Sequence, residues 1–260
     1  MGSSGVQGEL WGRAADDWAS LQEVQHGPFF EAMLDAAGVD ERVRFFDAGC
    51  GGGGASVLAA ERGAVVTGLD AAAELIEIAS ERVPGGDFRV GDLESLPFED
   101  EAFDAVVASN SIQYAENRIA AVQELARVAT SEARIAVGLF GAPEKVDFRV
   151  IFAAIRDAMP EPPSGDGPFG LSAPGVLQEL VEDAGLNVTD RGEVNVPFVY
   201  PDTEVFWQAL MSGGPMQASA DIVGEDALRI AVFDAIDPHI TNSGGVRLEH
   251  NIFQYVTATT

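Results

Sequence analysis

The sequence predicts an α/β fold in which helices cover both faces of a mostly parallel sheet. Short β-rich segments alternate with longer segments of helical apolar periodicity, which is the pattern of successive β-α-β units. Two of the β-rich segments, AVVTGL and DAVVAS, have the continuous apolar character of strands that are buried on both sides. Of the 260 residues, 47% are hydrophobic and 22% are charged, which excludes wholesale disorder and a fibrous repeat.

Two amphipathic helices are expected before the first strand. Apolar residues fall at helical spacing over residues 9–24, and the pattern repeats over residues 29–37 after Pro28. Residues 1–8, MGSSGVQG, are small and polar, and we expect a disordered end or a tag remnant there. Residues 9–40 are therefore interpreted as an N-terminal helical cap.

Seven strands and their connecting helices make up the predicted core, residues 41–200 and 246–260. The expected strands are residues 43–47, 64–70, 87–90, 102–108, 133–140, 187–196 and 246–258. The expected helices are residues 55–62, 72–83, 117–129, 145–159 and 173–184, with a Pro- and Gly-rich loop at 160–170. Residues 201–245 are predicted to be a helical insertion, broken at residues 213–215, that forms a lid over the carboxyl ends of the strands.

Charge and cysteine content exclude several classes of partner. The net charge of −27 repels phosphate, so nucleic acid and anionic membrane are poor partners. No apolar run approaches the roughly 20 residues that a membrane helix needs, and no signal sequence is evident, so a cytoplasmic location is expected. Cys50 is the single cysteine, which excludes an internal disulfide and a multi-cysteine zinc site, and no metal is expected.

The most informative segment is VRFFDAGCGGGGAS, residues 43–56. An apolar strand runs directly into glycines, which permit a positive φ and leave room for a ligand close to the backbone. The helix that follows presents free N–H groups to the same space, so an adenosine-containing ligand is expected. Gly49, Gly51 and Gly54 also satisfy the G-x-G-x-x-G dinucleotide pattern, so a nicotinamide-dependent reductase stays open at this point.

Three acidic residues close successive strands. Asp47 precedes the first glycine, where a carboxylate suits a cationic amino group. Asp70 ends the next strand, where an acid can accept both hydroxyls of a ribose. Asp92 follows the third strand and is placed to accept from an adenine amino group, while the backbone N–H of Leu93 can meet the ring nitrogen.

The ordered set Asp47-Ala-Gly49-Cys50-Gly51-Gly-Gly53, Asp70, Asp92 and Leu-Pro-Phe before Phe103-Asp104 resembles the class I S-adenosylmethionine-dependent methyltransferases. Within them it is similar to the small-molecule group that includes the ubiquinone and menaquinone biosynthesis enzymes. The resemblance is specific over about residues 43–140 and implies a Rossmann-like three-layer α/β/α sandwich, with a seven-stranded sheet whose last strand is antiparallel. Two departures, Ala72 for a serine and residues 130–133 for a Lys-Pro-Gly-Gly turn, concern local turns only.

The resemblance also implies roles for individual residues. S-adenosylmethionine is the implied cofactor and S-adenosylhomocysteine the product. The implied cofactor-binding residues are Asp47, Gly49, Cys50, Gly51, Gly53, Asp70, Ala71, Asp92, Leu93, Ser109 and Asn110. Cys50 is interpreted as a small packed residue rather than a nucleophile.

The acceptor side is less legible because methyl transfer needs positioning more than a dedicated catalytic motif. The candidates for acceptor contact or general base are His26, Gln113 and Tyr114, whereas His239 and His250 are interpreted as structural. An apolar acceptor pocket is expected from Trp11, Trp18, Phe29, Phe30, Phe206, Trp207, Leu210 and Met211.

The sequence therefore favours a methyltransferase that acts on a small, largely apolar organic acceptor by in-line displacement. One alternative is a catalytically silent cofactor-binding partner protein, and a weaker one is the nicotinamide-dependent reductase. DNA is disfavoured as the acceptor because Ser109-Asn110-Ser111-Ile112 stands where DNA amino-methyltransferases have Asn-Pro-Pro-aromatic. A monomer and a homodimer both stay open.

Overall fold

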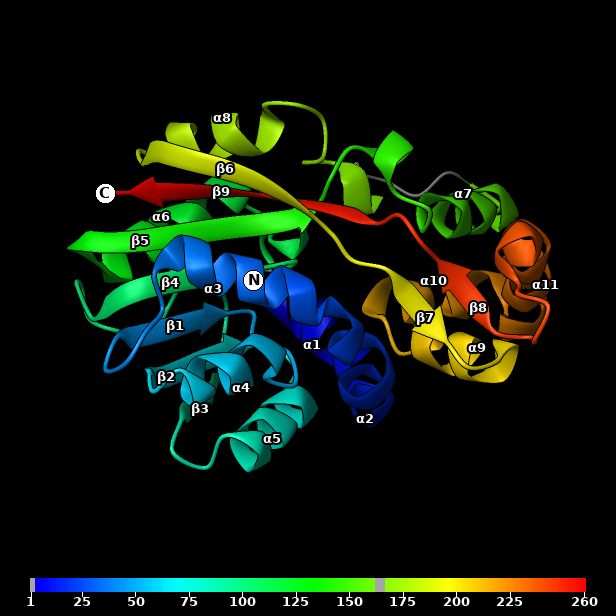
Figure 1. Ribbon diagram of the computed structural model, residues 1–260, viewed down its shortest axis with the longest axis horizontal. Coiled ribbons are helices and arrows are strands. Elements are labelled where there is room, and N and C mark those ends of the chain that lie inside the picture. The colour runs from blue at the N-terminus through cyan, green and yellow to red at the C-terminus, as the bar shows by residue number, and fades with distance from the viewer. Residues whose placement is uncertain (1–2, 162–166) are drawn as a thin grey trace.

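The computed structural model describes residues 3–161 and 167–260. Its centre is a seven-stranded sheet in the order β3-β2-β1-β4-β5-β9-β6. The strands are β1 (Arg44–Ala48), β2 (Val65–Asp70), β3 (Asp87–Val90), β4 (Phe103–Ser109), β5 (Ala129–Phe140), β6 (Asn187–Asn195) and β9 (Ile252–Thr259). Strand β9 is antiparallel to both of its neighbours, and β1 to β5 are parallel, as the opposite arrows of β1 and β9 show in Figure 1. The predicted α/β class and the antiparallel last strand are confirmed.

Helices cover both faces of this sheet. Helices α3 (Gly27–Ala37), α4 (Gly54–Glu61) and α5 (Ala73–Arg82) lie on one face, and α6 (Arg118–Val128) and α8 (Val176–Asp183) lie on the other (Figure 1). Phe45 and Phe46 are neighbours in β1 and both are fully buried, one in the hydrophobic cluster of each face. Side chains of adjacent strand residues point to opposite faces, which explains why the central strands read as continuous apolar runs.

The N-terminal segment differs from the expectation in two ways. Helix α1 (Ser4–Gly12) already begins at Ser4, so the expected disorder does not hold for residues 3–8, whereas residues 1–2 lie outside the described part of the chain. Gly8 is buried because α1 passes so close to the backbone of Ala71 that a side chain would not fit. The expected continuous helix over residues 9–24 is interrupted, as α2 (Ala15–Asp17), a π-helical turn over residues 18–22 and a 3₁₀ turn over residues 23–26 follow α1.

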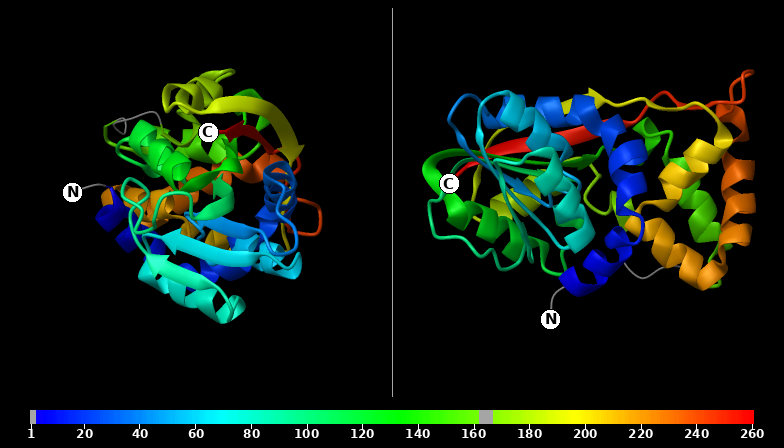
Figure 2. Two further views of the ribbon diagram at one scale, coloured as in Figure 1. Left: turned by 90° about the vertical axis from the view of Figure 1, so that its left-hand side faces the viewer. Right: turned by 90° about the horizontal axis from the view of Figure 1, so that it is seen from below.

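The helical insertion lies beyond the carboxyl ends of the parallel strands. It contains α9 (Thr203–Met211), α10 (Gly214–Val223) and α11 (Glu225–Ile236), which form a helical cluster with α7 (Arg149–Ala158) at one end of the sheet (Figure 2). The Asp202 side chain accepts a hydrogen bond from the backbone N–H of Val205 and so caps the start of α9. A two-stranded antiparallel sheet, β7 (Phe198–Tyr200) with β8 (Val246–Leu248), joins the insertion to the core.

The expected single strand over residues 246–258 is wrong, because the structure divides it into β8 and β9. Asn251 lies at the break and its side chain is fully buried. Its oxygen accepts from the backbone N–H of Phe148, and its nitrogen donates to the carbonyl groups of Val196 and Leu248. A buried amide with all of these partners fixes the break, because strand pairing through this position would leave them unsatisfied.

Among the described residues, no helix has both the length and the apolar character needed to cross a bilayer. Three or more histidine, cysteine, aspartate or glutamate side chains do not gather as potential metal ligands anywhere in this part of the chain.

Candidate functional site

Three carboxylates from the ends of successive parallel strands line one cavity. Asp47 is the penultimate residue of β1, Asp70 ends β2, and Asp92 comes two residues after β3. Ligands of open α/β sheets bind at this edge, where the strands end and the helices begin. Of the expected cofactor-binding residues, those that line this cavity are Asp47, Gly49, Cys50, Gly51, Asp70, Ala71, Asp92, Leu93, Ser109 and Asn110.

The backbone between β1 and α4 bends sharply around the Asp70 carboxylate. Gly49 and Gly51 have φ values of 78° and 56°, a region that other residues adopt only with strain. The N–H of Gly51 donates to Asp70 Oδ2 at 2.9 Å, and the N–H of Ala72 donates to Asp70 Oδ1 at 2.9 Å. Asp70 therefore fixes the bend, and each of its oxygens retains a further lone pair that can accept a hydrogen bond.

Gly53 does not line the cavity, unlike the other expected glycines. It lies at the N-terminus of α4, with a φ of 86°. A Cβ atom there would be 3.1 Å from the Cβ of Ala79 on α5. Gly53 therefore permits close packing of α4 on α5, and it does not take part in the cavity wall.

Asp47 lies in an environment that opposes its negative charge. Only 1% of its surface is exposed, and the Ser56 hydroxyl donates a hydrogen bond to its Oδ2 at 2.7 Å. Burial raises the pKa of Asp47 to about 7, and the neighbouring charge of Asp70 acts in the same direction. A cationic group in the cavity would stabilise the ionised form.

Glu23 is a second buried acid in the cavity, and the sequence analysis did not identify it. It is 3% exposed, its Oε1 accepts from the N–H of Gly52 at 2.8 Å, and its Oε2 lies 2.7 Å from the guanidinium of Arg82. Burial raises the pKa of Glu23 to about 7 even though Arg82 opposes that rise. Arg82 also donates to the carbonyl groups of Gly52 and Ala19, so this pair ties the N-terminal segment to the glycine bend. No sequence signal links positions 23 and 82.

Polar atoms without partners lie where β4 ends. Ser109 Oγ, Asn110 Oδ1 and Gln113 Oε1 are buried and make no hydrogen bond within the described structure, and all three residues line the cavity. Asn110 has a positive φ of 52°, which costs on the order of 1 kcal/mol and is typical of functional sites. A buried polar atom without a partner is unfavourable, so this end of the cavity is suited to a polar ligand.

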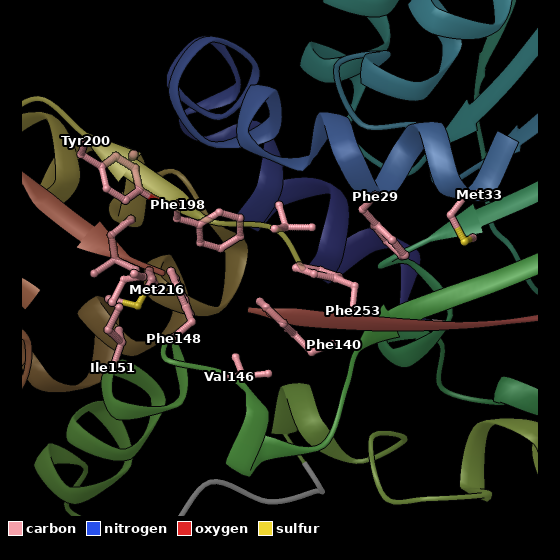
Figure 3. Packing of buried hydrophobic residues seen from close by; sticks show 14 of the residues in the cluster. Phe29, Met33, Phe140, Val146, Phe148, Ile151, Phe198, Tyr200, Met216 and Phe253 are labelled. Atoms are coloured by element: carbon pink, nitrogen blue, oxygen red, sulfur yellow. The ribbon is translucent and has the colours of Figure 1, made fainter. Parts of the chain in front are cut away.

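The other half of the cavity is apolar and partly differs from the expectation. Trp11, Trp18, Phe30 and Leu210 line it as expected. Phe29 and Phe206 are fully buried in the core instead, and Trp207 and Met211 face a separate depression on the surface. Other aromatic and apolar residues line the cavity in their place: Phe140 at the end of β5, Phe148 just before α7, Phe152 in α7 and Met216 in α10. Figure 3 labels Phe140, Phe148 and Met216.

The three residues proposed for acceptor contact or catalysis all line the cavity. His26 Nδ1 lies 3.1 Å from the carbonyl oxygen of Gln22, and the ring packs among aromatic side chains, including Phe30 and Phe198. Burial lowers the pKa of His26 to about 4 and raises the pKa of Tyr114 to about 12. Neither group changes its charge near neutral pH. His239 and His250 lie outside the cavity.

The surroundings of Cys50 and Arg13 indicate structural roles for both residues. Burial, followed by the charges of Asp47 and Asp70, raises the pKa of the Cys50 thiol, so this thiol is not activated as a nucleophile. Arg13 forms an ion pair with Asp221 of α10 at 2.7 Å and another with Glu9, and so it joins the N-terminal segment to the insertion.

Residues 46–137 match the family model described as a methyltransferase domain. Residues 46–137 therefore carry a methyltransferase domain, in agreement with the predicted methyltransferase family. One relative is the demethylmenaquinone methyltransferase of Renibacterium salmoninarum, with 31% identity over 120 residues, 46% of this chain and 51% of that protein. Another is the malonyl-[acyl-carrier protein] O-methyltransferase of Serratia marcescens, with 38% identity over 116 residues, 45% of each chain.

The chain spans about half the length of the curated relatives it matches. Among solved structures, the crystal structure of the [4+2]-cyclase SpnF is similar, with a TM-score of 0.59 and 21% identity, covering 90% of this chain and 81% of that chain. At this identity the similarity concerns the fold alone, and one fold can host different chemistry.

The residues present fit the cofactor of this family. The cavity combines four carboxylates, from Glu23, Asp47, Asp70 and Asp92, with no lysine or arginine among its described lining residues. S-adenosylmethionine carries a sulfonium and an ammonium group, which match this excess of negative charge, and one carboxylate, which neutral hydrogen-bond donors would have to hold. The unpartnered Ser109 Oγ and Asn110 Oδ1 provide further polar contacts at the same edge of the sheet.

Proposed function

We propose that this protein transfers a methyl group from S-adenosylmethionine to a small, largely apolar organic acceptor. The observation that carries the proposal is the shared cavity of Asp47, Asp70 and Asp92 around the glycine bend. Both parts of a transfer site adjoin there, because the same cavity is lined by carboxylates and by aromatic side chains.

In this proposal each cofactor contact has a named residue. Asp47 holds the ammonium group and favours the nearby sulfonium, Asp70 accepts from the ribose hydroxyls, and Asp92 accepts from the adenine amino group. Ser109 and Asn110 contact the amino-acid end. When bound, S-adenosylmethionine supplies a methyl group on a positively charged sulfur, which is already activated for displacement.

The chain's remaining task is to position the acceptor and to exclude water. In-line displacement requires the acceptor atom to face the methyl carbon on the side opposite the sulfur. The aromatic half of the cavity, closed by the N-terminal segment and the insertion, provides an apolar holder for such a molecule. His26 is neutral at pH 7 and weakly basic, so its expected role is contact with the acceptor rather than proton abstraction.

Isothermal titration calorimetry with S-adenosylmethionine and S-adenosylhomocysteine tests the cofactor assignment. Both are expected to bind the wild-type protein, and Asp70→Ala is expected to weaken binding at least 10-fold because a carboxylate acceptor is lost. Asp40→Ala, an exposed acid outside the cavity, is the matched control and leaves binding unchanged. Absence of binding to the intact protein would refute the proposal.

Two further measurements separate the alternatives. Methyl-labelled cofactor incubated with a metabolite extract yields labelled product if the protein is a transferase, whereas a silent cofactor-binding protein yields none. A thermal shift produced by nicotinamide dinucleotides but not by S-adenosylhomocysteine would favour the reductase.

A further inference from the structure

The lining of the cavity restricts the acceptor by charge and hydrogen bonding as well as by its apolar surface. This inference rests on the proposed function. We propose that the acceptor is an uncharged aromatic molecule that bears a hydroxyl group, and that Gln113 selects it by accepting a hydrogen bond from this hydroxyl. Three features carry the proposal: the charge of the lining, the arrangement of its rings, and the state of the Gln113 amide.

The lining has no counter-charge for an anionic acceptor. None of its described residues is lysine or arginine, and its acids are repulsive to a carboxylate or phosphate. Apart from the acids Glu23, Asp47, Asp70 and Asp92, the polar side chains of the described lining are neutral, among them Gln7, Gln22, His26, Gln113 and Tyr114. A charged group placed among them would lose its hydration without a compensating partner. The acceptor is therefore uncharged at the part that enters this cavity.

The rings of the lining suit a flat aromatic molecule. Trp11 makes edge-to-face contacts with Trp18, at 4.7 Å between ring centroids, and with Tyr114, at 5.6 Å. Phe148 contacts Phe140 at 6.0 Å and Phe152 at 5.1 Å, and Figure 3 shows Phe140 and Phe148 near each other between the sheet and the insertion. Aromatic faces and edges from separate elements thus surround the same cavity and favour offset or edge contacts with another ring.

The Gln113 amide requires a hydrogen-bond donor from the ligand. Its side chain is 8% exposed and lines the cavity, as does the neighbouring Tyr114. Its Oε1 is buried and has no partner in the described structure, so this carbonyl oxygen remains as an acceptor. A hydroxyl group can donate to this oxygen, whereas an ether or a carboxylate cannot. The same contact would be lost once that hydroxyl became a methyl ether.

Equilibrium dialysis with three matched probes tests this proposal. The probes are 2-naphthol, 2-methoxynaphthalene and 2-naphthoate at pH 7.5, measured with the wild-type protein both free and saturated with S-adenosylhomocysteine. We expect 2-naphthol to bind about 3- to 10-fold more tightly than 2-methoxynaphthalene, the range for one neutral hydrogen bond. We expect it to bind at least 10-fold more tightly than the anionic 2-naphthoate.

Gln113→Leu removes the acceptor oxygen at similar size. It is expected to bring the ratio of naphthol to methoxynaphthalene affinity to about 1 without weakening 2-methoxynaphthalene. The control is Gln178→Leu, which replaces a half-buried glutamine of α8 outside the cavity and keeps the wild-type ratio. If Gln113→Leu does not fold, Gln113→Met makes the same test. The affinity ratios of the wild-type protein also test the preference for an uncharged hydroxyl compound without any variant.

The proposal is overturned if 2-naphthol does not bind, if 2-naphthoate binds as tightly as 2-naphthol, or if the Gln113 variant keeps the wild-type ratio. Failure here is distinct from failure of the proposed function. Calorimetric binding of S-adenosylhomocysteine with no selection among the probes refutes this inference alone, whereas selection without cofactor binding refutes the transferase.

Discussion

Replacing Asp47 by asparagine should make the free protein more stable and the cofactor complex weaker. The carboxylate is buried with the Ser56 hydroxyl as its side-chain partner, and burial raises its pKa from 3.8 to about 7. That rise corresponds to about 4 kcal/mol of unfavourable free energy for the ionised form, at about 1.4 kcal/mol for each pH unit. Asparagine has a similar shape and carries no charge, so it removes this cost.

The pH dependence of the difference follows from linkage. The stability that protonated Asp47 contributes is fully present below its ordinary pKa and is lost as the pH rises through about 7. At pH 8 wild-type Asp47 is ionised in the folded protein, so Asp47→Asn should raise the unfolding free energy by up to about 4 kcal/mol. At pH 5 the wild-type carboxyl is already protonated, and the advantage should shrink to roughly 1–2 kcal/mol.

Urea denaturation at pH 5 and pH 8 measures this difference, and calorimetry measures the affinity for S-adenosylmethionine. Asp47→Asn should bind the cofactor at least 10-fold more weakly at pH 8, since an ammonium group loses its charged acceptor. Asp183→Asn, an exposed acid on α8, is the control and should change neither quantity. The reasoning is refuted if Asp47→Asn destabilises the protein at pH 8 or binds the cofactor as wild type does.

The glycine bend and its buried ion pair allow two further predictions. Gly51→Ala should destabilise the protein by about 2 kcal/mol in urea denaturation, because its φ is 56° and its Cβ would lie 2.6 Å from Glu23 Oε1. Gly175→Ala, also at a positive φ but with open space around it, should cost only about 1 kcal/mol, and equal losses would contradict the contact argument. Arg82→Met should destabilise by about 3 kcal/mol at pH 8, because the buried Glu23 loses its partner, and by less at pH 5, where Glu23 is protonated. A loss that does not depend on pH would show that Arg82 acts through packing alone.

Local patterns in the chain were enough to locate the core and the strand-end residues that line the cavity. Strands β1 to β4 lie within one residue of their expected bounds, because buried parallel strands and glycine turns are marked by contiguous residues. The positions of Asp47, Asp70 and Asp92 follow from this, since parallel strands in one sheet bring their carboxyl ends to the same edge.

The acceptor half was predicted less well, because helical periodicity does not say which neighbour an apolar face meets. Phe29 and Phe206 have the expected helical placement, yet they point into the core. Phe148 and Met216 line the cavity although nothing in their own segments distinguishes them from core residues.

By itself, the sequence determined the alternation of strands and helices, the bend at Gly49 and Gly51, and the three acids at the strand ends, all of which depend on residues close together in the chain. Only the tertiary structure decided the pairing of Glu23 with Arg82, the break at Asn251 and the partner-free oxygen of Gln113. These depend on contacts between distant segments, where burial removes water and makes every missing partner costly.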